Sequence, residues 1–159
     1  MSMLRRPALD PDTIERRTST IYPAPHDAVT RGRAKRSLTA ALGLTQLGVN
    51  VTELAPGAAS ALRHWHSHED EFVFVLEGEP TLVTSEGEQI LRPGQCAGFP
   101  AGVADGHQLV NRTSQPVRVL EVGTRDPRDE GNYPDIDLRC APGRYSQAIF
   151  TKKDGSPLG

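Results

Sequence analysis

Apolar and polar residues alternate with a period of two through the middle of this chain. Leu47, Val49 and Val51 alternate with small or polar neighbours, and residues 71–77 are rich in Phe and Val. This pattern is typical of β-strands, whose successive side chains point to opposite faces of a sheet. Similar short segments occur at residues 62–66, 81–84, 89–91, 97–99, 107–111 and 117–122. The pattern therefore predicts an all-β fold of short strands, a sandwich or a barrel.

Glycine and proline separate these segments. The chain of 159 residues holds 15 Gly and 13 Pro, a share above the roughly 12% of average proteins. Pro56-Gly57, Ser85-Glu86-Gly87 and Pro93-Gly94 each fall between two predicted strands. There is no internal repeat, so the excess indicates many turns rather than a fibrous or repetitive architecture.

The length suits one domain flanked by two arms. We expect the barrel over residues 41–125, an N-terminal arm over residues 1–40 and a C-terminal arm over residues 126–159. Prolines at positions 7, 11, 23 and 25 exclude a long helix from the first arm, and the second arm has turn-forming residues and few apolar ones. Both arms are expected to cover outer faces of the barrel.

The charge balance narrows the range of partners. Lys and Arg number 18 against 20 Asp and Glu, a net charge of −2, so we expect neither a nucleic-acid binder nor a membrane-surface protein. Arg31, Arg33, Lys35 and Arg36 form a local basic cluster. It is either an anion contact or a solvated segment, and the balanced net charge favours the solvated segment.

The chain also lacks features of export. No stretch of about 18 apolar residues occurs, and the N-terminal residues lack the apolar region of a secretory signal. Cys96 and Cys140 form no CxxC motif and no disulfide framework, so a reducing, cytoplasmic location is expected. Cys96 is expected to be a small buried residue rather than a ligand.

Three of the five histidines lie at positions 64, 66 and 68. Residues i and i+2 of a strand share a face, so His64 and His66 can direct two imidazoles at one point. Glu71 opens the following strand and can add a carboxylate. Two imidazoles and a carboxylate suit a divalent transition-metal ion. A further donor would come from His107, which lies in a strand-like segment, or from His26, which lies in the proline-rich arm; the strand position favours His107.

Each of these residues also has a structural interpretation. A single histidine in a strand is more often a hydrogen-bonded core or surface residue than a ligand, and a single glutamate there is usually solvated. His68 follows His64 and His66 at the same two-residue spacing but lies in a predicted turn. It is either an additional ligand or a solvent-facing residue, and the turn favours solvent.

Two motifs resemble those of the cupin superfamily. The segment Gly57-x6-His64-Trp65-His66-x4-Glu71-x6-Gly78 resembles the first cupin motif, which has one residue fewer after its glycine. The segment Gly94-x5-Pro100-x-Gly102-x4-His107-x3-Asn111 resembles the second, with two extra residues after Gly102. Both departures lie in predicted loops, where insertions are tolerated. Longer phrases that begin at His64, Leu91, Leu120, Tyr133 and Phe150 are similar to small, single-domain bacterial cupins of the type-2 conserved-barrel kind.

The resemblance implies a cupin-type double-stranded β-helix, or jelly-roll barrel, with one divalent metal (Fe, Mn, Ni or Zn) held by His64, His66, Glu71 and His107. It also implies a homodimer and a small-molecule partner. Cupins include dioxygenases, decarboxylases, isomerases and metal-free binding proteins. No residue of the sequence stands out as a separate general base, and no nucleophilic set is present. We therefore expect metal-centred chemistry on a small oxygen-rich molecule such as a carboxylate, polyol or sugar. The alternative is a ligand-binding or sensing module with a structural metal.

Overall fold

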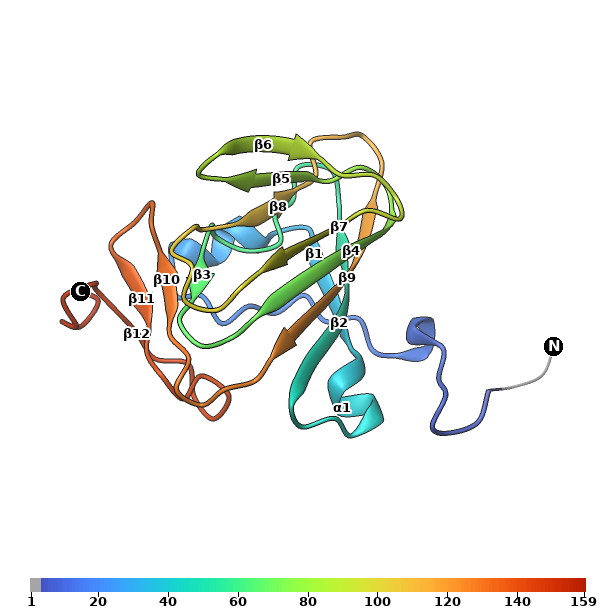
Figure 1. The fold of residues 1–159 in the computed structure, drawn as a ribbon, viewed down its shortest axis with the longest axis horizontal. Coiled ribbons are helices and arrows are strands. Elements are labelled where there is room, and N and C mark those ends of the chain that lie inside the picture. The colour runs from blue at the N-terminus through green and yellow to red at the C-terminus, as the bar shows by residue number, and fades with distance from the viewer. Residues whose placement is uncertain (1–3) are drawn as a thin grey trace.

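The computed structural model describes residues 4–159 and confirms the all-β fold predicted from the sequence (Figure 1). Its strands are β1 (Arg33–Ser37), β2 (Leu47–Leu54), β3 (Trp65–His66), β4 (Glu71–Glu77), β5 (Thr81–Thr84), β6 (Gly87–Ile90), β7 (Cys96–Phe99), β8 (Gln108–Val110), β9 (Val117–Thr124), β10 (Gly131–Tyr133), β11 (Leu138–Cys140) and β12 (Phe150–Thr151). The helices are short: η1 (Pro11–Thr13), η2 (His26–Thr30) and α1 (Leu38–Leu42). In the described part of the chain, no helix is long and apolar enough to cross a membrane.

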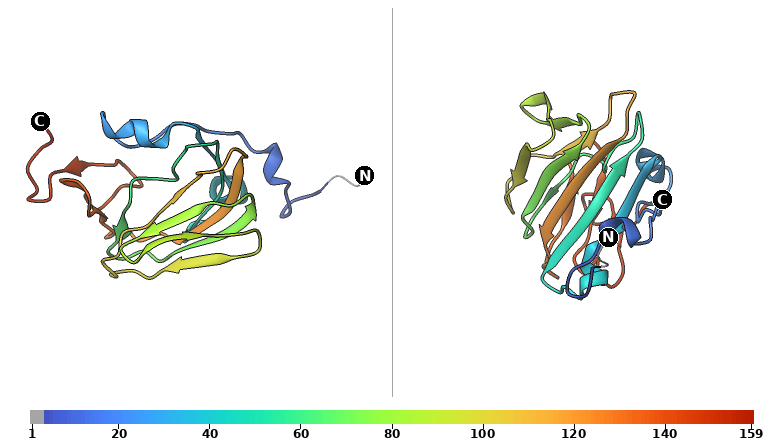
Figure 2. Two further views of the ribbon diagram at one scale, coloured as in Figure 1. Left: turned by 90° about the horizontal axis from the view of Figure 1, so that it is seen from above. Right: turned by 90° about the vertical axis from the view of Figure 1, so that its right-hand side faces the viewer.

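The strands form three antiparallel sheets. The largest has the order β1-β2-β9-β4-β7, and the smaller two have the orders β6-β5-β8 and β12-β11-β10-β3. In Figures 1 and 2 the β5, β6 and β8 sheet lies across from the five-stranded sheet. Leu82 of β5 and Leu109 of β8 pack in one core with buried residues of the large sheet. Neighbours in the sheets are often distant in sequence, as in the pairing of β2 with β9.

The inner face of the large sheet changes character along its length. At one end Leu54 pairs with Val117, and Val75 pairs with Val119; all four side chains are almost fully buried and belong to the main core. Because side chains alternate along a strand, Glu121 of β9 shares this inner face with Val117 and Val119. The interior is therefore apolar at one end and polar at the other.

The N-terminal arm contributes a strand that the sequence pattern does not reveal. β1 lies at the edge of the large sheet, with Lys35 in register with Thr52 of β2. Arg33 is buried, and Lys35 is partly buried. Arg36, on the opposite face of β1, is also partly buried and forms an ion pair with Glu53. The expectation that this basic cluster is a solvated segment is therefore wrong for Arg33, Lys35 and Arg36, because pairing of β1 with β2 brings these side chains against the rest of the protein.

The C-terminal arm forms a second structural unit beside the barrel. Strands β10, β11 and β12 pair with one another, and β10 also pairs with β3, which carries His66 (Figure 1). A separate small core contains Tyr133, Leu138 and Cys140. This arm is thus hydrogen-bonded directly to the strand that carries a candidate ligand.

Candidate metal centre

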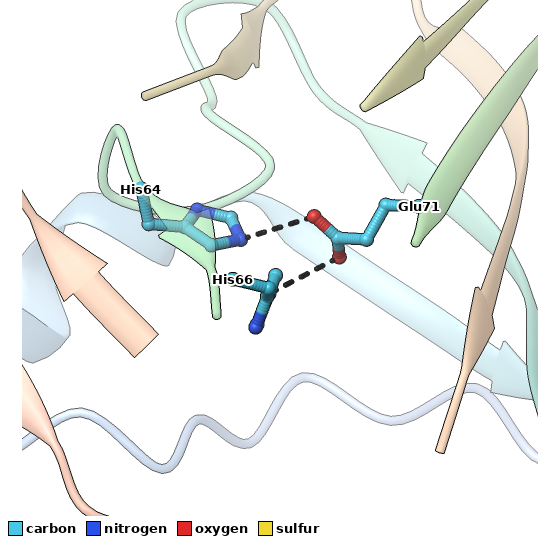
Figure 3. A group of neighbouring side chains, drawn as sticks. All are labelled: His64, His66 and Glu71. Atoms are coloured by element: carbon cyan, nitrogen blue, oxygen red, sulfur yellow. Dashed lines mark ion pairs between the residues drawn. The ribbon is translucent and has the colours of Figure 1, made fainter. Parts of the chain in front are cut away.

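The four candidate ligands come from different elements but face one another. His66 lies in β3, and Glu71 is the first residue of β4. His64 and His107 form an antiparallel bridge just outside the named strands. Figure 3 shows His64 and His66 directed at the two oxygens of the Glu71 carboxylate. The structure thus brings together the residues that the two sequence motifs single out.

The carboxylate of Glu71 is the centre of the cluster. Its Oε2 lies 3.5 Å from Nε2 of His64 and 2.7 Å from Nε2 of His107, and its Oε1 lies 3.4 Å from Nε2 of His66. Donor atoms of His64, His66 and Glu71 all lie within 4.8 Å of one another. His107 is not part of that mutual group and joins it through Glu71.

Hydrogen bonds on the far side of two rings fix which nitrogen faces the centre. Nδ1 of His64 lies 2.7 Å from the carbonyl oxygen of Leu62, and Nδ1 of His66 lies 2.6 Å from Oδ2 of Asp129. Because a carbonyl only accepts, Nδ1 of His64 is the protonated nitrogen. In the neutral ring its Nε2 therefore directs a lone pair at Glu71.

That arrangement fits a bound cation. A lone pair facing a carboxylate is repulsive unless a proton or a metal ion lies between them. Outer hydrogen bonds from Nδ1 to carbonyl or carboxylate groups are also the usual support of metal-binding histidines. The donor set of imidazole nitrogens and one carboxylate suits a divalent transition-metal ion such as Zn, Fe, Ni or Mn.

The protonation of the metal-free cluster follows from the same contacts. Burial tends to raise the pKa of Glu71, but hydrogen bonds from His107, His64 and His66 hold that pKa well below its ordinary value. Burial tends to lower the pKa of His66, yet Asp129 and Glu71 raise it to about 9. Burial lowers the pKa of His107. Without a metal, a proton on His66 compensates the Glu71 carboxylate.

A buried ionic network from the C-terminal arm supports His66. Asp129, whose side chain is fully buried, also accepts a hydrogen bond from Nη1 of Arg144 at 2.7 Å. Arg144 forms an ion pair with Glu69, which is itself buried and accepts from the Tyr145 hydroxyl. The network fixes the orientation of His66. It escapes sequence reasoning because it joins residues 63 and 78 positions away from His66.

The other candidate residues lie apart from the cluster. His68 is exposed in the turn before β4, and its ring contacts Ser67, so the solvent-facing interpretation is the correct one. His26 belongs to η2 in the N-terminal arm and does not line the cavity that contains the cluster. Cys96 is exposed, so the expectation that it is buried is wrong.

A cavity of about 690 Å³ opens onto the cluster. His64, His66, Glu71 and His107 all line it, together with residues of β1, β2 and β9. Phe99 also lines it and stacks on the His107 ring, with ring centroids 3.6 Å apart. The cluster is therefore accessible to a small molecule from the interior of the barrel.

The barrel and this cluster define the class of protein: an antiparallel β-barrel with histidines and a glutamate converging in its interior. A family model described as "Cupin domain" matches residues 50–123. A crystal structure from Silicibacter pomeroyi DSS-3, described as a sugar phosphate isomerase from a cupin superfamily, is 49% identical and has a TM-score of 0.92. The match covers 96% of this chain and 97% of that one. This chain belongs to the cupin superfamily.

Two further solved structures are similar. A candidate sugar phosphate isomerase from Acidithiobacillus ferrooxidans is 28% identical, with a TM-score of 0.71 and coverage of 80% of each chain. A polyketide cyclase from Streptomyces resistomycificus is 21% identical, with a TM-score of 0.61 and coverage of 78% of this chain and 81% of that one, and shows the fold alone. No curated protein matches this chain.

Proposed function

We propose that this protein is a metal-dependent cupin enzyme that isomerises a phosphorylated sugar between its aldose and ketose forms. The observation that carries the proposal is the convergence of His64, His66, Glu71 and His107 at the wall of a cavity large enough for a sugar phosphate. The similarity to a protein described as a sugar phosphate isomerase favours isomerisation over oxygenation or decarboxylation.

The cavity carries charges that suit a phosphate ester. Four cations line it (Arg33, Lys35, Arg125 and Arg144) against three carboxylates (Glu69, Glu71 and Glu121). Lys35 and Arg144 are in ion pairs. Arg33 donates only to backbone carbonyls, and the guanidinium of Arg125 lies over the Tyr145 ring, so neither forms an ion pair within the described residues. These two cations are available to an anionic group.

Different residues would bind the metal ion, orient its ligands and bind the phosphate of the substrate. The three histidines and Glu71 would hold one divalent ion, which when bound polarises the carbonyl of the substrate as a Lewis acid. Asp129 keeps the Nε2 face of His66 directed at that point. The unpaired arginines would bind the phosphate and position the sugar carbon chain along the inner face of β9.

The test is an isomerisation assay on the reloaded protein. Protein stripped with a chelator and reloaded with Mn(II), Fe(II), Ni(II) or Zn(II) is incubated with C5 and C6 sugar phosphates, and products are resolved by NMR. We expect conversion by the wild type and by His68→Ala and none by His66→Ala. A protein that binds metal but converts no sugar phosphate would contradict the proposal and favour a binding or sensing role.

A further inference from the structure

Glu121 occupies an unusual position for a charged residue. It lies on the inner face of β9, in register with Val73 of β4, while Gly123 of β9 is in register with Glu71. Glu71 and Glu121 are therefore diagonal neighbours on the same face of adjacent strands, roughly 7–8 Å apart at their backbones. A Cβ on Gly123 would lie 3.7 Å from Cγ of Glu71, so this glycine places no side chain against the Glu71 carboxylate from β9. A second carboxylate thus lies next to the candidate metal centre, inside the same cavity.

The two oxygens of Glu121 have different environments. Oε2 accepts hydrogen bonds from Nζ of Lys35 and from Oγ1 of Thr52, each at 2.8 Å. Oε1 accepts none from the described residues, and it is not among their buried polar atoms without a partner, so it is open to the cavity. A carboxylate held by one oxygen, with the other free, is oriented to accept a proton from a bound molecule.

Building on the isomerase function above, we propose that Glu121 is the general base that moves a proton between the two reacting carbons. The assignment needs a carboxylate in reach of a molecule bound at the His/Glu cluster, and the diagonal placement beside Glu71 supplies it. Lys35 and Thr52 act as positioning residues, because they reach the substrate only through Glu121. No other carboxylate that lines the cavity fits: Glu69 is paired with Arg144 and Tyr145, and Glu71 belongs to the cluster.

The reaction balances without an external reagent. Oε1 removes a proton from the hydroxyl-bearing carbon next to the carbonyl, and the C–H electron pair forms a double bond between the two carbons. The carbonyl oxygen takes the negative charge, giving an enediolate. The proton on Glu121 then returns to the former carbonyl carbon, while the hydroxyl proton of the neighbouring carbon passes to the former carbonyl oxygen. One carbon is reduced, its neighbour is oxidised, and Glu121 ends as it began.

A structural ion pair is the competing interpretation, since Lys35–Glu121 also ties edge strand β1 to β9. Glu121→Gln separates the two, because glutamine is isosteric and keeps an oxygen for Lys35 and Thr52 but does not accept a proton at neutral pH. Glu53→Gln is the matched control: Glu53 pairs with Arg16 and Arg36, lies on neighbouring β2 and does not line the cavity.

The experiment follows fructose 6-phosphate and ribulose 5-phosphate in D₂O by NMR with the metal-loaded full chain. Conversion and deuterium incorporation at the reacting carbons are measured beside bound metal and the urea unfolding midpoint. We expect Glu121→Gln to lose about 10²–10⁴-fold in both rates, with metal content and unfolding midpoint close to wild type. Glu53→Gln should keep wild-type rates.

Other outcomes overturn the role of Glu121. If Glu121→Gln kept wild-type rates, Glu121 would not be the general base, and the proposed isomerase function would be unaffected. A wild type that binds metal but neither converts nor exchanges either sugar phosphate would overturn both the base and the proposed function.

Discussion

His64 and His107 exchange both of their backbone hydrogen bonds. The amide of His64 donates to the carbonyl of His107 at 3.1 Å, and the amide of His107 donates to the carbonyl of His64 at 2.9 Å. Residues paired in this way place their side chains on the same side of the ladder, and the two rings lie 4.8 Å apart. This backbone pair joins the two sequence motifs, so the site is assembled by the barrel itself rather than by flexible loops.

Removing the support of His66 should weaken metal binding without abolishing the fold. Asp129→Asn replaces the carboxylate that holds Nδ1 of His66 at 2.6 Å, and loss of such an outer contact typically costs 10–100-fold in metal affinity. We expect that increase in the dissociation constant for Zn(II), measured by competition with a chromophoric chelator. Asp126→Asn is the control, because Asp126 pairs with Arg128 at the surface. Equal affinities for wild type and Asp129→Asn would show that the contact does not tune the site.

The stability of the metal-free protein should depend on pH in a predictable direction. The pKa of folded His66 is raised from 6.5 to about 9, so its stabilising contribution is complete below about pH 6.5 and is lost as the pH rises through about 9. The lowered pKa of Glu71 acts oppositely: its contribution is present above about pH 4.5 and is lost as the pH falls. The lowered pKa of His107 favours the folded state above about pH 6.5, so chelator-treated protein should melt highest near pH 6–7.

The Asp129→Asn variant tests the predicted loss of stability above about pH 6.5. Because Asp129 holds the pKa of His66 high, the variant should lose less of its melting temperature between pH 6.5 and 9 than the wild type does. Thermal unfolding in the presence of a chelator measures this. Parallel curves for the two proteins would contradict the role assigned to Asp129.

The phosphate preference should depend on Arg125. Arg125→Gln removes a cavity-lining cation that has no ion pair in the described chain, and a charge-assisted hydrogen bond contributes about 1.5–3 kcal/mol. We expect the dissociation constant of fructose 6-phosphate to rise at least about 10-fold and that of fructose to stay unchanged, by calorimetry on metal-loaded protein. Arg128→Gln, on the same loop but outside the cavity, should bind both as the wild type does. A parallel loss of both sugars would exclude phosphate recognition by Arg125.

Gly78 should contribute strongly to the free energy of unfolding. Its φ of +78° lies in the left-handed region, and an added Cβ would lie 2.7 Å from the carbonyl oxygen of Pro116 and 2.8 Å from Cγ2 of Val117. Backbone strain and steric overlap together should cost Gly78→Ala about 3 kcal/mol of unfolding free energy. Gly94→Ala has a similar φ of +86° but no neighbour within 4 Å, so about 1 kcal/mol is expected. Urea denaturation compares them, and equal losses would rule out the steric argument.

The sequence predicts the strands that have strong local signals. The segments expected at residues 71–77 and 81–84 coincide with β4 and β5, because alternating apolar residues and flanking turns mark both. β1 escapes prediction because three of its five residues are cations, and burial of Arg33 depends on a pairing with β2 that no local pattern shows. Strands β10 to β12 are too short for periodicity to reveal.

The sequence predicts the four residues of the cluster but not the residues that support them. His64, His66, Glu71 and His107 are recognisable from motif spacing, and the structure brings them together. Asp129 and Arg144 have no such signal, because they reach His66 only through the fold of the C-terminal arm. The sequence does contain an indication of Glu121. It follows Val117 and Val119 at the same two-residue spacing and so faces the interior, where a charged side chain is costly without a partner or a function.

The proposed isomerase function and the role of Glu121 both require that the four-residue cluster bind a metal ion. Chelator-stripped protein is titrated with Mn(II), Fe(II), Ni(II) and Zn(II), dialysed, and its bound metal is counted by elemental analysis. We predict one ion per chain for the wild type, His26→Ala and His68→Ala, and a sharp loss for alanine variants of His64, His66, Glu71 and His107. A wild type that retains no metal, or a His107→Ala variant that keeps full metal while His26→Ala or His68→Ala loses it, would contradict this assignment.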